Sequence, residues 1–163
     1  MTKPFLLLLA FAFTQLSVKA QSDCDELKKE NEYLKKAIKF TTPTKTLTSS
    51  KIDFNLIKVE GNTKEQSVDI VLTLTNRDVN KNINLSKAVA IDIEANEYET
   101  YNTKIGSGGS RNKIYTDTPV KTVIRFTKIL PGVKMLKLVP ISYYDESGNT
   151  VGIEFKDLTI DWK

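Results

Sequence analysis

The chain has 163 residues, of which 40% are hydrophobic and 27% are charged, with 24 basic residues against 20 acidic ones. This length is typical of one domain with a short extension, and the hydrophobic share is sufficient for a packed core. The sequence contains no histidine, which removes the commonest general base and the commonest zinc ligand, and a single cysteine, which excludes an intramolecular disulfide and any CxxC metal site. We expect no cofactor and no structural metal.

The first twenty residues have the pattern of a secretory signal peptide (residues 1–20). Lys3 supplies a positive charge, and residues 5–13 form an apolar stretch that is too short to cross a bilayer. Residues 18–20 (VKA) then place small residues at positions −3 and −1 of a cleavage site. We therefore predict that the mature chain begins at Gln21 and is exported, either to the periplasm or into the medium.

Removal of the signal peptide changes the charge balance. The cleaved segment contains Lys3 and Lys19 and no acidic residue, so the mature chain keeps 22 basic residues against 20 acidic ones. A net charge of +2 does not indicate a nucleic-acid-binding protein, because such a protein needs basic side chains clustered on one face. No later apolar run is long enough to span a membrane. A lipid anchor on Cys24 is disfavoured because no small apolar box precedes it.

Residues 21–40 are predicted to form a short helical stalk that self-associates as a coiled coil. The run from Cys24 onward lacks glycine and proline and is rich in Leu, Lys and Glu, which are good helix formers. When Leu27 and Leu34 occupy heptad position d, Cys24, Asn31 and Ile38 occupy position a. These five residues are the expected contacts between two chains.

The charges around this seam favour a parallel pair. Asp23 and Glu30 fall at position g and would meet Lys28 and Lys35 at position e of a second copy. The sequence thus predicts a homodimer through residues 23–38, with a trimer left open, and an interchain disulfide at the single cysteine as a further option. The alternatives are a lone amphipathic helix packed on the sheet and a frayed stalk, since so short a helix is marginal on its own.

A threonine- and serine-rich segment, residues 41–50, follows the helix. Pro43 restricts its predecessor to extended geometry, and five threonines oppose continuation of the helix. We expect a semi-extended linker here. The alternative is a first edge strand, because threonine also suits a pleated surface.

Residues 51–163 are predicted to fold as an antiparallel β-sandwich of seven to eight strands. Short runs alternate between apolar and polar residues, and a change of phase at Ile57 predicts a bulge. Turn-forming residues separate the runs, including Glu60-Gly61-Asn62, Pro131-Gly132 and Ser147-Gly148-Asn149. A closed barrel is the alternative. The expected strands lie in residues 52–59, 68–74, 89–93, 124–126, 136–138, 151–155 and 158–162.

Several of these segments resemble segments of a known family of domains. They are the strand ending in LTLTN at Asn76, Ala90-Ile91-Asp92 with Asn96-Glu97-Tyr98 behind it, Val120 to Phe126 before a Pro-Gly turn, Leu136-Lys137-Leu138, and the closing residues 154–160. Over residues 52–162 the chain resembles the immunoglobulin-like β-sandwich domains of secreted bacterial proteins of unknown function, and through them the family of a small secreted mycobacterial immunogenic antigen. The resemblance implies an immunoglobulin-like fold and export, and it brings no catalytic or binding residue.

Three groups of residues are candidate sites. Asp92, Glu94, Glu97 and Glu99 could hold Ca²⁺, but a solvated outer face explains the acidic pattern equally well. Residues 106–111 (GSGGSR) lack the ending and the following helix of a phosphate-binding loop, which favours a mobile loop. Tyr143 and Tyr144 precede a turn, with one tyrosine expected inside and one outside, and could provide a ligand face.

These observations favour a non-enzymatic exported protein in which the helix presents a β-sandwich for contact with an envelope protein or for envelope structure. The alternative function is a small-ligand or glycan-binding module that uses a tyrosine-bearing sheet face and the loop at residues 102–113. Hydrolysis by paired carboxylates is the enzymatic option that needs no histidine, and the sequence specifies no such pair.

Overall fold

The computed structural model describes residues 24–38, 42–145 and 147–163. It divides the chain into two compact units, Met1–Thr41 and Thr42–Lys163, which we describe separately. The predicted signal peptide (residues 1–20), the cleavage site before Gln21, and Asp23 lie outside the described residues.

The first unit contains a helix over residues 24–38, which confirms the helix expected within residues 21–40. Asp25 lies one turn before Lys28, with 4.0 Å between their charged atoms, at the end of the helix where acidic groups complement the helix dipole. Leu27 and Leu34, the two d positions, are 64% and 50% exposed. The apolar stripe is therefore present on the surface of this helix, and its pairing with a second chain remains a prediction.

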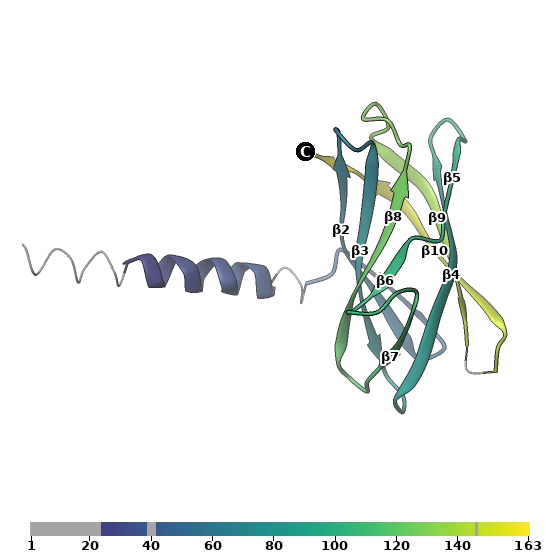
Figure 1. The fold of residues 1–163 in the computed structure, drawn as a ribbon, viewed down its shortest axis with the longest axis horizontal. Coiled ribbons are helices and arrows are strands. Elements are labelled where there is room, and N and C mark those ends of the chain that lie inside the picture. The colour runs from purple at the N-terminus through teal and green to yellow at the C-terminus, as the bar shows by residue number, and fades with distance from the viewer. Residues whose placement is uncertain (1–23, 39–41, 146) are drawn as a thin grey trace, which may run out of the picture. The chain divides into compact units, whose positions relative to one another are not determined.

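The second unit is mainly β and consists of two sheets, one strictly antiparallel and one antiparallel except for a short C-terminal strand (Figure 1). In the first sheet the strands lie in the order β1-β2-β3-β8-β6, and β11 pairs with β2 in parallel. Its strands are β1 (Lys45–Ser49), β2 (Ile52–Asn62), β3 (Ser67–Asn76), β6 (Thr103–Ile105), β8 (Pro119–Thr127) and β11 (Asp161–Trp162).

The second sheet has the order β10-β9-β4-β5, and β7 also pairs with β4. Strand β4 is the longest and has β9 on one edge, whereas β7 and β5 share the other edge one after the other. Its strands are β4 (Lys81–Asp92), β5 (Glu97–Thr100), β7 (Arg111–Ile114), β9 (Met135–Tyr144) and β10 (Thr150–Thr159).

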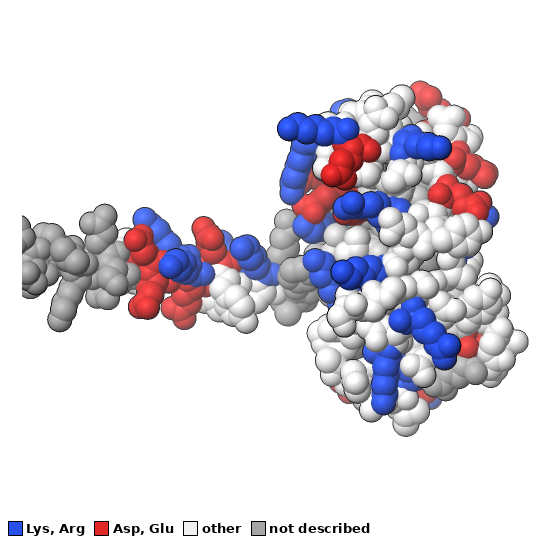
Figure 2. Space-filling model, viewed as in Figure 1, with Lys and Arg blue, Asp and Glu red and all other residues white. Residues whose placement is uncertain are grey.

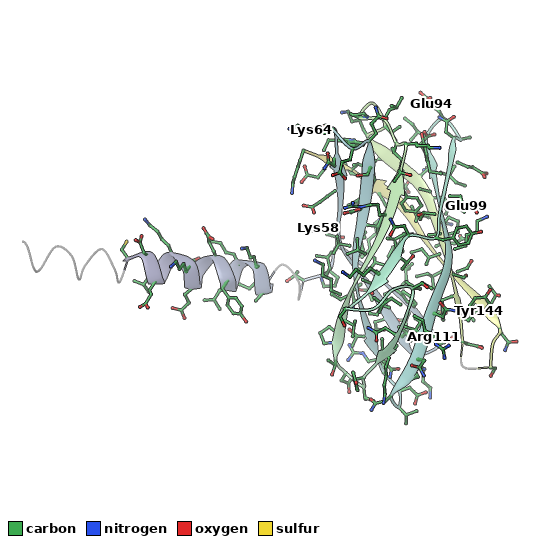
Figure 3. The ribbon with its side chains drawn as sticks, viewed as in Figure 1. Lys58, Lys64, Glu94, Glu99, Arg111 and Tyr144 are labelled. Atoms are coloured by element: carbon green, nitrogen blue, oxygen red, sulfur yellow. The ribbon has the colours of Figure 1, made fainter. Side chains whose placement is uncertain are left out.

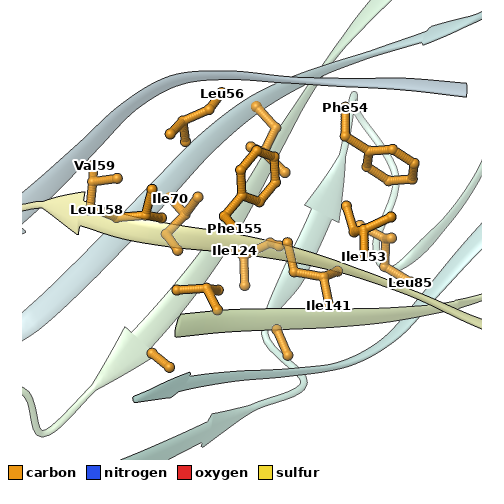
Figure 4. Close-up of a cluster of buried hydrophobic side chains, with 14 of the residues drawn as sticks. Phe54, Leu56, Val59, Ile70, Leu85, Ile124, Ile141, Ile153, Phe155 and Leu158 are labelled. Carbon is orange, nitrogen blue, oxygen red and sulfur yellow. The ribbon is translucent and has the colours of Figure 1, made fainter. Parts of the chain in front are cut away.

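The inner faces of the two sheets enclose one hydrophobic core (Figure 4). Phe54 and Ile70 come from the first sheet and Ile141 and Phe155 from the second, and each is almost completely buried. Removal of this apolar surface from water at ~25 cal/mol per Å² is the main force that holds the sheets together. The predicted β-sandwich class is thus confirmed at the level of two packed sheets.

The structure corrects the strand count and several strand assignments. The described residues form eleven strands and not seven or eight, because β1 lies in the segment expected to be a linker and short strands β5, β6 and β7 lie in a region where the sequence predicted no strand. The strand expected at residues 158–162 is divided between the end of β10 and β11. Residues Glu60-Gly61-Asn62 end strand β2 and do not form the predicted turn. The bulge predicted near Ile57 is confirmed by a register shift between Leu56 and Lys58.

The linker interpretation of residues 41–50 is wrong for Lys45–Ser49, which form edge strand β1, the alternative that threonine content allowed. Leu47 packs against the core, and the Lys45 ammonium reaches across to the backbone carbonyl of Lys156 in the other sheet. The β unit accordingly begins at Thr42 and not at residue 51.

Candidate functional site

The two tyrosines at the end of β9 point in opposite directions, as the sequence predicted. Tyr143 is fully buried, its ring lies 5.3 Å from that of Phe54, and its hydroxyl donates a hydrogen bond to Ser49 Oγ at 2.9 Å. The suggestion that Tyr143 contributes to a ligand face is therefore wrong, because its side chain belongs to the core. Tyr144 is 41% exposed on the outer face of the second sheet.

Tyr144 belongs to a row of side chains that crosses three neighbouring strands. Asn84 on β4 is paired with Tyr144 on β9 and, on its other edge, with Arg111 on β7. Ile83 and Leu85 are buried, so the alternation of the strand directs Asn84 and Asn82 outward on the same face. Figure 3 shows the labelled Arg111 and Tyr144 close together on this part of the sandwich.

A groove of about 410 Å³ follows this row. It combines the side chains that recognise polar ligands: one aromatic ring, two amides, one guanidinium and one carboxylate. Asn82, Asn84 and Arg111 make no side-chain hydrogen bond or ion pair within the described part of the chain, so their donors and acceptors remain available. The residues that line the groove are Asn82, Ile83, Asn84, Arg111, Tyr144 and Asp145.

The loop before β7 places Arg111 beside β4. Gly106 adopts a positive φ of 57°, which glycine tolerates without strain, and the amide of Asn112 donates to the Ile105 carbonyl at 2.8 Å. The carbonyl of Ser110 accepts the backbone N–H of Leu85 at 2.9 Å, which joins the loop to the middle of β4. The glycine-rich segment is thus a hydrogen-bonded turn that leads into a strand, and a strand offers no helix N-terminus for a phosphate.

A second exposed tyrosine lies near the groove. Tyr101 is 65% exposed, and a hydrogen bond to Glu99 raises its pKa, with a smaller contribution from the nearby Tyr144. Lys87 in turn forms an ion pair with Glu99 at 2.6 Å, and this contact lowers the pKa of Glu99. The outer face of the second sheet therefore presents two aromatic rings together with hydrogen-bonding groups.

The acidic run contains one buried carboxylate, which corrects the expected solvated face. Asp92 is only 3% exposed, because its oxygens accept hydrogen bonds from the backbone N–H groups of Glu94 and Asn96, the Asn96 amide and the Tyr98 hydroxyl. Burial raises the pKa of Asp92, but these hydrogen bonds outweigh it and the net pKa is lowered. Asp92 thus holds the turn between β4 and β5, where Glu94 is exposed.

The described residues contain no group of three or more acidic, cysteine or histidine side chains arranged to hold a metal ion. On the face shown in Figure 2, lysines and arginines lie among acidic and neutral side chains. Several basic side chains of the sandwich form ion pairs, such as Lys58 with Glu60 and Arg125 with Asp69. No helix in the part of the chain that the structure describes is both long and apolar enough to span a bilayer.

On the helix, the five predicted interchain residues remain together on the surface. Cys24 is exposed, and Ile38, like the two leucines at the d positions, is largely exposed at 62%. The positions a and d are one turn apart on the same side of a helix, so the side chains of Cys24, Leu27, Asn31, Leu34 and Ile38 form one stripe.

Comparison of the chain with protein-family models and with curated proteins finds no match. Sequence reasoning did not identify Asn82, Asn84 or Asp145 as site residues, and it included Arg111 only as part of the loop at residues 102–113. A signal for two of them exists in the sequence, because Asn80, Asn82 and Asn84 alternate with Lys81, Ile83 and Leu85. Asparagine is depleted in strands, so a period-two row of asparagines indicates an unusual polar strand face.

Proposed function

We propose that this protein is a non-enzymatic, exported binding module whose β-sandwich recognises a saccharide through the groove beside Tyr144. The observation that carries this proposal is the row Arg111–Asn84–Tyr144 on three neighbouring strands. Of the two functions that the sequence allowed, glycan binding and contact with an envelope protein, the groove favours glycan binding.

The chemistry of the groove suits a sugar. An exposed aromatic ring covers the apolar C–H face of a pyranose, and the amides of Asn82 and Asn84 can both donate to and accept from hydroxyl groups. Neighbouring strands lie about 4.8 Å apart, so the Cα atoms of Arg111 and Tyr144 are separated by roughly 10 Å, which is enough for one or two sugar rings. The groove is open and polar, unlike the enclosed apolar pockets that suit drug-like ligands.

We further propose that the sandwich is immunoglobulin-like. Its first sheet contains the order β2-β3-β8-β6 and its second the order β10-β9-β4. Labelled A to G along the chain, these orders match the ABED and GFC sheets of immunoglobulin domains, with β5 in the position of an added C′ strand. This strand order supports the resemblance found in residues 52–162.

The helix is proposed to bring two such modules together. Leu27 and Leu34 expose apolar surface that a second helix would cover, at ~25 cal/mol per Å² removed from water. Each exposed charge pair adds only about 0.2–1 kcal/mol, so the charges select a parallel orientation more than they add affinity. Two binding heads on one dimer would increase the avidity for a repeating polymer.

A binding screen tests the saccharide proposal. Purified mature protein is titrated with cell-wall fragments and envelope oligosaccharides by isothermal calorimetry. We expect saturable binding that Tyr144→Ala abolishes. Tyr33→Ala is the matched control, because Tyr33 is a 72% exposed tyrosine on the helix. Failure of every saccharide to bind, or equal loss in both variants, would contradict the proposal.

Light scattering and non-reducing electrophoresis of the mature chain test the helix proposal. We expect a concentration-dependent dimer that Leu27→Asp dissociates and Asn31→Leu strengthens, because a buried asparagine at position a reduces coiled-coil stability. An interchain disulfide at Cys24 would appear as a dimer band that a reducing agent removes. A monomer at millimolar concentration, unaffected by Asn31→Leu, would refute the coiled coil.

A further inference from the structure

Among the residues that the structure describes, Arg111 has no carboxylate partner, unlike the other two arginines of the sequence. Arg77 bonds to Asp53 and Asp117, each at 2.8 Å, and Arg125 makes two parallel hydrogen bonds of 2.7 Å to Asp69. No described residue forms an ion pair or hydrogen bond with the side chain of Arg111. Its guanidinium charge is therefore available to a ligand in the groove.

The charge around the groove is uneven. Lys113 points to the same side of β7 as Arg111, but its ammonium lies over the Tyr115 ring, 5.3 Å from the ring centre, so Arg111 is the cation that lines the β7 end of the groove. The carboxylate of Asp145 is at the β9 end and already accepts the backbone N–H of Asn149 at 2.8 Å and the amide of Asn149 at 3.4 Å. One end of the groove thus carries a guanidinium, and the other carries a carboxylate that is already hydrogen-bonded to Asn149.

Resting on the proposed function, we infer that the ligand is an acidic saccharide, with a carboxylate or phosphodiester group bound by Arg111 and a sugar ring stacked on Tyr144. The planar guanidinium fork matches such anions with two parallel hydrogen bonds, which gives orientation as well as affinity. The amides of Asn82 and Asn84, between the two ends, would bind ring hydroxyls. The acidic group therefore lies toward β7 and the uncharged part of the sugar toward Asp145.

Matched ligand pairs test this inference on the mature protein. Trimers of galacturonate, glucuronate and mannuronate are compared with their carboxyl methyl esters, and a phosphodiester-linked glycan fragment is compared with its neutral phosphate methyl triester. We expect each acidic ligand that binds to exceed its neutral counterpart by at least about tenfold in affinity. This preference should weaken at high ionic strength, because screening acts on charge pairs and not on stacking.

Two variants assign the preference to the guanidinium. Arg111→Met should reduce the affinity for each acidic ligand to that for its neutral counterpart in the same variant, and Arg111→Lys should restore part of the acidic preference. Lys104→Met, an exposed cation on the outer face of the other sheet, is the control and should have no effect. Saccharide binding through Tyr144 without an acidic preference, or a preference that Arg111→Met leaves intact, overturns the inference and leaves the proposed function standing. Absence of binding to both acidic and neutral sugars overturns both.

Discussion

The contact between Gly61 and Trp162 leads to a quantitative prediction. Trp162, on the last strand, pairs with Gly61 in parallel, and its ring nitrogen donates a hydrogen bond to the Val133 carbonyl at 2.7 Å. A Cβ atom added at Gly61 would lie 2.3 Å from Cε3 of the Trp162 ring, far inside van der Waals contact. We expect Gly61→Ala to displace the tryptophan and lower the free energy of unfolding by about 1–3 kcal/mol, the usual cost of overpacking.

A double-mutant cycle isolates this contact. In a Trp162→Ala background the clash is absent, and Gly61→Ala should be neutral or stabilise by about 0.5 kcal/mol, because alanine restricts the unfolded chain more than glycine does. Gly152→Ala is the matched control, since a Cβ at this strand position meets no atom within 4 Å. Urea unfolding followed by far-UV circular dichroism measures all variants without relying on tryptophan fluorescence. Equal effects of Gly61→Ala in both backgrounds would refute the steric argument.

Three further predictions concern stability. Tyr143→Ala should cost about 3–5 kcal/mol and Tyr143→Phe about 0.5–1.5, whereas the exposed Tyr144→Ala should change thermal stability little. The lowered pKa of Asp92 stabilises the fold above the usual aspartate pKa, and this contribution is lost as pH falls through the lower folded-state pKa. In the Asp92→Asn variant, the free energy of unfolding should therefore fall less steeply as the pH is lowered. Finally, a fragment of residues 42–163 should melt cooperatively and at a higher temperature than residues 51–163, which lack β1, and equal melting would contradict this.

Local patterns in the sequence were sufficient for the elements that depend on neighbours along the chain. The helix follows from an uninterrupted run of helix formers, and the bulge in β2 follows from the change of phase at Ile57. The orientation of Tyr143 could also have been derived, because it continues the alternation of Val139 and Ile141, which are both buried. The pattern of residues within one helix or one strand was enough in these cases.

The alternation of apolar and polar residues did not predict the buried face of a strand where both faces carry apolar residues. In the expected strand at residues 89–93 the larger apolar side chains are Val89, Ile91 and Ile93, but Ala88, Ala90 and Asp92 are the residues that face the core. The larger side chains therefore suggested the wrong face of the strand. Near the turn, the hydrogen bonds that hold the buried aspartate determine which residues face the core. Ile93 lies beyond the strand and is 68% exposed.

The groove could not be derived locally, because its residues meet only through cross-strand pairing. Asn84 and Tyr144 are 60 positions apart and become neighbours when β4 pairs with β9, and Arg111 reaches the same row through a strand that the sequence did not indicate. The period-two asparagines marked one strand of the site. The pairing partners of that strand depend on the whole sheet topology, which no local pattern contains.

The position of the groove on the outer face separates recognition from folding. The side chains of Asn84, Arg111 and Tyr144 point away from the core, so their substitution removes no buried apolar surface and should leave the unfolding free energy within about 0.5 kcal/mol. The side chains directly behind them, such as Ile83 and Tyr143, are fully buried, and changes there would reduce both stability and binding. If a substitution of an outward-facing residue reduces binding and leaves the unfolding free energy unchanged, the loss is due to ligand contacts. If binding and stability fall together, the loss is due to damage to the fold.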